Sequence, residues 1–343
     1  MIRRVIKTGF VYLVCQLCVL LAIVGPAYLY YHFRDQAKAA SINWGVTFSI
    51  SQSQSLGLDW KANYLAILDD LHPSGIRLIA GWDTIEPNLQ AWNDDDLDWE
   101  VAQADSRKVP IIIAIGQKVP RWPECHIPTW ADNDANKRSQ QLLDYERHVI
   151  GRYKNTGSLL YWQVENEPYL AFGACDQKDT GVIDREVALV HQLDPRHLVL
   201  MTDGGEWGAW YPAAARGDLF GTTMYRYVFD RRMNMEQQYY LPPEYYQAKA
   251  DLTRLMTGKP NLKVIVSELG LEPWGNKQIS DMTLTEQKNY LPLANLKETL
   301  NFAQQTGFDT YYLWGTEWWY YAKVHGAPEY WNEIQQVIRL NKI

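Results

Sequence analysis

The chain has 343 residues, with 33 Lys and Arg against 40 Asp and Glu and a formal net charge of −7. Residues 1–40 hold five cations and one acid, which leaves 28 cations and 39 acids, a net charge of −11, for the remaining 303 residues. An acidic domain with no basic run argues against nucleic-acid binding, which depends on cationic contacts to phosphate.

The N-terminal segment predicts a membrane anchor. Residues 9–31 contain no charged side chain and are long enough to cross a bilayer as a helix. Arg3, Arg4 and Lys7 precede them, so the positive-inside rule places the N-terminus in the cytoplasm and the following domain outside it. The alternative is a cleaved signal peptide, whose apolar region is normally about 7–15 residues long. The absence of any Asn-X-Ser/Thr sequon fits a bacterial exported protein anchored in the inner membrane and facing the periplasm or cell surface.

We therefore divide the chain into residues 1–40, which hold the cytoplasmic N-terminus, the membrane helix and a short linker, and a folded domain over 41–343. In the domain, short apolar runs alternate with longer amphipathic ones. The expected strands are 42–50, 75–81, 109–116, 158–166, 197–205, 219–225, 262–270 and 309–315. The expected helices are 60–71, 97–107, 136–153, 185–193, 207–217, 243–256, 293–307 and 330–340.

Regular alternation of this kind predicts an α/β fold with a parallel sheet, and eight units favour a closed (β/α)8 TIM barrel. An open doubly wound sheet is the alternative. However, no Gly-rich phosphate loop follows the first strand, where the sequence reads GVTFSISQSQS. In a barrel the active site lies at the carboxyl ends of the strands. The polar and aromatic residues at those ends are Arg77, Glu165, Asn166, Glu167, Tyr225, Glu268 and Trp314.

Two carboxylates, an aromatic wall and no metal or nucleotide motif suit the cleavage of glycosidic bonds, for which we expect neither a metal nor a cofactor. One carboxyl must protonate the leaving oxygen, and the other must attack the sugar or activate water. In a regular strand Glu165 points to the opposite face from the other inward residues, so we expect it to have a structural role. Glu167 and Glu268 are the predicted catalytic pair.

These motifs resemble the clan A glycoside hydrolases, the superfamily of cellulase-, β-galactosidase- and β-xylosidase-like barrels. The resemblance rests on Asn-Glu-Pro at 166–168 after the fourth strand, Glu268 after the seventh strand and Trp314 after the eighth. It implies a retaining, two-glutamate cleavage of β-glycosidic bonds in an oligo- or polysaccharide. The implied roles are Glu167 as acid/base, Glu268 as nucleophile, Asn166 on the sugar 2-hydroxyl, Arg77 and Tyr225 as partners of Glu268, and Trp314 as the floor of the −1 subsite. Strand three ends in GQKVP rather than in a His-containing pattern, which disfavours a cellulase.

Three further tryptophans, Trp82, Trp122 and Trp318, follow strands two, three and eight and are candidates for subsite walls or for plain packing. Cys125 and Cys175 follow neighbouring strands, and we predict that they form a disulfide in an oxidising compartment. A second function class stays open. The protein could instead be a membrane-anchored transglycosylase, or a non-hydrolytic glycan-binding barrel in cell-envelope or exopolysaccharide assembly.

Overall fold

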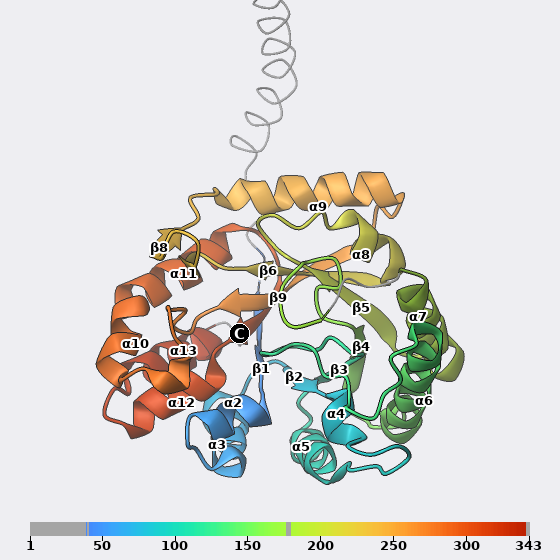
Figure 1. Cartoon of the computed structure of the whole chain (residues 1–343). Helices are drawn as coiled ribbons and strands as arrows, with labels where there is room; N and C mark the ends of the chain where they lie inside the picture. The colour runs from blue at the N-terminus through green and yellow to red at the C-terminus, as the bar shows by residue number, and fades with distance from the viewer. Residues whose placement is uncertain (1–38, 40, 176–179, 341–343) are drawn as a thin grey trace, which may run out of the picture.

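The computed structural model describes residue 39, residues 41–175 and residues 180–340. In these ranges eight parallel strands close into one barrel that is surrounded by helices (Figure 1), so the predicted (β/α)8 fold is confirmed. The predicted membrane helix over residues 9–31 lies outside the described residues. No helix in the described part is long and apolar enough to cross a membrane.

Each predicted barrel strand forms, and its ends differ from the predicted ones by a few residues. The barrel strands are β1 Asn43–Thr47, β2 Ile76–Ile79, β3 Ile111–Ile115, β4 Leu159–Val164, β5 Leu198–Asp203, β6 Leu219–Met224, β9 Lys263–Gly270 and β10 Thr310–Trp314. They pair in parallel in the order β1-β10-β9-β6-β5-β4-β3-β2, and β2 pairs with β1. All strands therefore point their carboxyl ends to the same mouth of the barrel.

The helices also follow the predicted alternation. They are α2 Ile50–Ser55, α3 Trp60–Ala66, α4 Trp82–Ile85, α5 Asp95–Ser106, α6 Ala135–Tyr153, α7 Thr180–Leu193, α8 Tyr211–Arg216, α9 Pro243–Thr257, α10 Leu284–Tyr290, α11 Leu293–Gln305, α12 Thr316–Val324 and α13 Glu329–Leu340. A π-helical turn over Ile67–Leu71 extends α3, and a short 3₁₀ turn covers Ile279–Asp281. Side-chain caps fix several helix starts: Asp134, for example, accepts from the backbone N–H groups of Asn136 and Lys137 at the start of α6.

The helices α2, α4, α10 and α12 were not predicted, and neither was one hairpin. An antiparallel hairpin, β7 Tyr227–Asp230 and β8 Met235–Gln238, is inserted between β6 and α9. Its segments YVFD and MEQQ lack a regular apolar alternation, and Phe229 is the one buried residue of the two strands. The hairpin lies at the carboxyl end of the barrel, where it can contribute to the site.

The core has two parts. One cluster inside the barrel joins five strands and consists of Ile112, Leu200, Leu219, Ile265 and Tyr312. A larger cluster fills the space between the strands and the surrounding helices. Because side chains pack the interior of the barrel, as is usual for this fold, the space for a ligand lies above them, at the carboxyl ends of the strands.

Candidate active site

A cavity of about 430 Å³ opens at the carboxyl end of the barrel, a size typical of small-ligand sites. Five of the predicted site residues line it, and four of them lie at or just after strand ends: Glu167, Tyr225, Glu268 and Trp314. They come from the ends of β4, β6, β9 and β10. Trp122, from the loop after β3, also lines the cavity and is 54% exposed.

Glu268 is the carboxylate of this cavity that pairs with an arginine of the barrel strands. Arg77 Nη2 donates to its Oε1 at 2.7 Å, and the Tyr225 hydroxyl donates to its Oε2 at 2.8 Å. Arg77 is fully buried, and its other nitrogens donate to Thr47 Oγ1 at 3.0 Å and Gln163 Oε1 at 3.1 Å, which fixes the guanidinium plane. Burial and the negative charge of Glu268 raise the pKa of the Tyr225 hydroxyl, so Tyr225 stays a hydrogen-bond donor.

Glu167 has a different environment in the same cavity. Burial raises the pKa of its carboxyl well above the usual value, and the negative charges of Glu268 and Glu124 raise it further. Its Oε1 is buried and has no hydrogen-bond partner among the described residues. Its backbone N–H donates to Thr202 Oγ1 at 2.9 Å, which ties the turn after β4 to β5. Glu167 is therefore a buried carboxyl with a raised pKa and one oxygen without a hydrogen-bond partner, in the same cavity as the arginine-paired Glu268.

Glu124, a further carboxyl that lines the same cavity, was not predicted. Lys118 Nζ lies 3.3 Å from Glu124 Oε2 and donates to the carbonyl oxygens of Glu167 and Leu170, each at 3.0 Å. Burial raises the pKa of Glu124 to about 7, and the Lys118 ammonium limits the rise. The Lys118–Glu124 pair thus supports the turn that carries Glu167 and adds a titratable group to the cavity.

Glu165 has the structural role that was expected, although β4 ends at Val164 and Glu165 has φ +59°, so the regular strand assumed for that expectation does not reach it. Its Oε1 accepts from Gln117 N at 2.9 Å and its Oε2 from Lys118 N at 2.7 Å, so the carboxylate holds the loop after β3 against the end of β4. Gly116 makes this approach possible: it has φ +126°, and a Cβ there would lie 2.5 Å from Glu165 Cδ.

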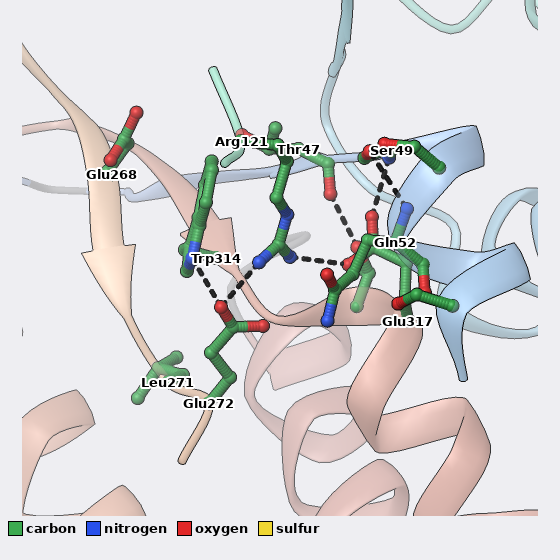
Figure 2. Close-up of polar contacts among 12 residues, drawn as sticks. Thr47, Ser49, Gln52, Arg121, Glu268, Leu271, Glu272, Trp314 and Glu317 are labelled. Carbon is green, nitrogen blue, oxygen red and sulfur yellow. Dashed lines mark hydrogen bonds and ion pairs between the residues drawn. The ribbon is translucent and has the colours of Figure 1, made fainter. Parts of the chain in front are cut away.

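Trp314 is held in place by charged groups from the loops after β3 and β9. Its Nε1 donates to Glu272 Oε1 at 2.7 Å, and the Arg121 guanidinium stacks on its ring with Cζ 4.0 Å from the centroid. Arg121 also pairs with Glu272 and, at 2.8 Å, with the buried Glu317. Figure 2 shows the guanidinium between these two carboxylates with the indole beside it. The floor of the cavity is therefore rigid.

Two of the predicted aromatic residues do not line the cavity. Trp82 is fully buried at the start of α4, where its Nε1 donates to Glu86 at 3.0 Å. Trp318 is fully buried in α12, where its Nε1 donates to Gln287 at 2.9 Å and its ring packs on Tyr330. The prediction of subsite walls at these two positions was wrong, because both loops continue directly into helices that turn the indoles toward the core.

Asn166 lies behind the cavity wall rather than on it. It is 1% exposed, and its Oδ1 accepts from Gln163 Nε2 at 3.1 Å. Its backbone N–H donates to Lys118 O at 2.6 Å. Asn166 therefore fixes the turn that carries Glu167, and its contact with a sugar hydroxyl stays a prediction.

Strained backbone gathers around the cavity. Arg121, Glu124, Glu165 and Glu167 all have positive φ, at 82°, 62°, 59° and 43°. Such conformations cost non-glycine residues about 1–3 kcal/mol each and persist where the surrounding contacts impose them, which is common at functional sites. The predicted disulfide between Cys125 and Cys175 is present, with Cα atoms 4.8 Å apart, and joins the loops after β3 and β4 that carry these residues.

No protein-family model matches the sequence, and no curated protein is similar to it in sequence. Solved structures are similar in fold. GH5_18 from Streptomyces cattleya, solved in complex with GlcNAc, has a TM-score of 0.55 at 15% identity and covers 80% of this chain and 70% of its own.

Two further structures give the same result. The exo-β-1,4-mannosidase of an Opitutaceae bacterium has a TM-score of 0.55 at 14% identity, covering 82% of this chain and 53% of its own. A β-galactosidase from a Rahnella species has a TM-score of 0.55 at 12% identity, covering 89% and 56%. At sequence identities of 12–15%, the comparison shows a similarity of fold alone. The chain is therefore similar in fold to glycosidases, in agreement with its resemblance to the clan A glycoside hydrolases.

Proposed function

We propose that the protein is a retaining glycoside hydrolase that cleaves β-glycosidic bonds in an oligo- or polysaccharide. The observation that carries the proposal is the difference between two carboxyls in one cavity. Glu268 is paired with Arg77 at 2.7 Å, whereas burial and the charge of Glu268 raise the pKa of Glu167. A carboxylate that is paired with a cation suits the role of nucleophile, and a neighbouring carboxyl whose pKa is raised suits the role of general acid.

In the first step Glu268 attacks the anomeric carbon, the glycosidic bond breaks, and the leaving oxygen takes the proton of Glu167. In the second step Glu167, now a carboxylate, takes a proton from water as that water attacks the anomeric carbon and releases Glu268. The charge of Glu268 is lost when the glycosyl ester forms. Because that charge raises the pKa of Glu167 in the free enzyme, its loss lowers the pKa and favours the base role of the second step.

The surroundings support these roles. Tyr225 and Arg77 hold both oxygens of Glu268, so the attacking oxygen has a fixed direction. The clamped Trp314 indole offers an apolar surface for the sugar ring next to it. The GlcNAc bound in the structure of GH5_18 from Streptomyces cattleya, which shares the fold, supports a carbohydrate as the ligand class.

Substitution of each glutamate tests the assignment. Glu167→Ala should still be glycosylated by an aryl β-glycoside with a good leaving group, and azide should then restore turnover and give the β-glycosyl azide. Glu268→Ala should give the α-azide or no product, because its nucleophile is missing. The reverse pattern would exchange the two roles, and wild-type rates in both variants would contradict the proposal.

We also propose that the domain is anchored in the membrane by residues 9–31 and acts outside the cytoplasm. The cations Arg3, Arg4 and Lys7 before this apolar segment support the orientation, and the Cys125–Cys175 bridge supports an oxidising compartment. Expression in Escherichia coli with C-terminal alkaline phosphatase or green fluorescent protein tests it. We expect phosphatase activity in the membrane fraction; a fluorescent fusion without phosphatase activity would contradict the proposal.

A further inference from the structure

Trp207 is the most exposed tryptophan among the residues that line the cavity. It lies in the loop after β5, lines the cavity and is 75% exposed. Its ring meets Tyr239 edge to face, with centroids 6.1 Å apart and planes at 83°. Tryptophan side chains are on average strongly buried, so an indole exposed at the mouth of a cavity indicates contact with a ligand or partner.

The loop that presents Trp207 is fixed on its N-terminal side. The Glu206 side chain points inward, and its Oε1 accepts from Tyr225 N at 2.8 Å and from the Tyr246 hydroxyl at 2.7 Å. The Glu206 carbonyl accepts from the Tyr245 hydroxyl at 2.6 Å. With a further bond from Lys249 Nζ to the same carbonyl at 3.4 Å, four hydrogen bonds from α9 and from the residue after β6 hold Glu206.

The rest of the loop is equally constrained. Gly205 N donates to Thr223 Oγ1 at 2.8 Å, and the backbones approach so closely that a Cβ at Gly205 would lie 1.8 Å from Thr223 O. On the other side, Trp210 N donates to Asp203 Oδ2 at 3.0 Å, and Trp210 Nε1 donates to the Gly204 carbonyl at 2.9 Å. The loop is thus a rigid support that displays one aromatic ring.

The hairpin supplies the second ring of this wall. Tyr239 follows β8, and Tyr239 N donates to Arg226 O at 2.9 Å while Arg226 Nη1 donates back to Tyr239 O at 2.5 Å. Val228 and Phe229 of β7 line the same cavity. The Trp207–Tyr239 wall is therefore continuous with the catalytic cavity and has a fixed geometry before any ligand binds.

The wall lies on the side of the proposed acid. The loop begins at Gly204, where a Cβ would lie 3.7 Å from Glu167 Oε1. Glu167 protonates the oxygen that joins the leaving sugar, so the leaving sugar lies on this side of the cavity. Trp314, in contrast, packs against Arg77, the partner of Glu268.

We propose that Trp207 and Tyr239 form a sugar-stacking subsite for the leaving-group side of the substrate, so that the substrate is an oligosaccharide or polysaccharide chain rather than a glycoside of a small alcohol. This inference rests on the proposed function for the direction of the chain. Large aromatic side chains bury much apolar surface at little conformational cost, and a rigid loop removes most of the remaining ordering cost.

The first test compares two classes of substrate. 4-Nitrophenyl β-glycosides place no sugar beyond the cleaved bond, whereas β-1,4-linked manno-, gluco- and N-acetylglucosamine oligosaccharides of two to six units do. For Trp207→Ala we expect the ratio of kcat/KM for the best oligosaccharide to that for its nitrophenyl glycoside to fall about tenfold, with partial recovery in Trp207→Phe. Tyr240→Ala is the matched control, because Tyr240 is 82% exposed in the same segment but does not line the cavity. An unchanged ratio in Trp207→Ala would overturn the proposal.

A binding measurement separates this proposal from the proposed hydrolysis. Calorimetric titration of the full-length Glu268→Gln protein with the same oligosaccharides gives affinities without turnover. We expect Trp207→Ala in this background to weaken the binding of the best-bound six-unit chain about tenfold and Tyr240→Ala to leave it unchanged. If the indole contributes to binding in this way but the wild-type protein hydrolyses none of the substrates, the proposed hydrolysis is refuted and the sugar-stacking subsite stands. Equal affinity with and without the indole, or no binding of any chain, would refute the subsite.

Discussion

Removal of the Cys125–Cys175 bridge gives a stability change that can be worked out from the chain. The two residues are 50 positions apart in sequence, so the bridge closes a loop of that length in the unfolded chain. The loop-entropy relation gives about 14 cal/mol/K for such a loop, which is about 4 kcal/mol at 25 °C. The Cys125→Ser/Cys175→Ser double variant should therefore lose about 4 kcal/mol of unfolding free energy.

An unfolding entropy of about 2.1 cal/mol/K per residue over the roughly 300 residues of the domain makes each kcal/mol worth about 1.6 °C, so the expected decrease in melting temperature is about 6 °C. Differential scanning calorimetry of the oxidised wild type, the wild type in dithiothreitol and the double variant measures it. The reduced wild type and the variant should coincide, since both lack the same cross-link. A variant that melts within about 2 °C of the oxidised wild type would refute the reasoning.

Three other changes have defined outcomes. Glu165→Gln should lower the free energy of unfolding, measured in urea, by about 2–4 kcal/mol, because the new amide NH₂ would point at a backbone N–H group that now donates to a carboxylate oxygen. A loss below about 0.5 kcal/mol would contradict the structural role. Because Glu167 acts when protonated and its pKa is raised, kcat/KM should fall with rising pH only well above the usual carboxyl range, and Glu124→Gln, which removes a nearby negative charge, should move this fall to lower pH. A pH profile that is the same in this variant would show that Glu124 does not act on Glu167. Arg121→Lys should lower kcat/KM about tenfold, because lysine cannot pair with Glu272 and Glu317 and also stack on Trp314; wild-type kinetics would show that the floor needs no clamp.

Much of the frame of this molecule could be predicted from the sequence, because apolar runs and amphipathic repeats are local signals. VPIIIAIG forms β3, a strand buried on both faces, and VIVSELG ends at the cavity with Glu268. The barrel topology then brings Glu167 and Glu268 to one mouth, since all parallel strands end on the same side. Position along the chain was therefore enough to find the two candidate catalytic carboxyls.

Side-chain direction and long-range pairing could not be predicted in the same way. Trp82, Trp318 and Trp314 all lie at or just after the end of a barrel strand, but of the three only Trp314 faces the cavity. The helices α4 and α12 begin directly after their strands and turn Trp82 and Trp318 into the core. Arg121 meets partners 151 and 196 positions away, and no local pattern encodes such a contact. Trp207 was missed because it was assigned to an expected helix over 207–217, whereas α8 begins at Tyr211 and Trp207 lies in the preceding loop, exposed.

Trapping of the glycosyl-enzyme tests the central claim most directly. The wild-type protein is incubated with 2,4-dinitrophenyl 2-deoxy-2-fluoro-β-glycosides of glucose, galactose and mannose, whose good leaving group allows attack and whose fluorine slows hydrolysis of the ester. Peptic digestion and mass spectrometry then locate the added sugar. We predict a single label on Glu268, formed also in Glu167→Ala and absent in Glu268→Ala. A label on Glu167 or another residue, or turnover with inverted anomeric configuration and no label, would contradict the account.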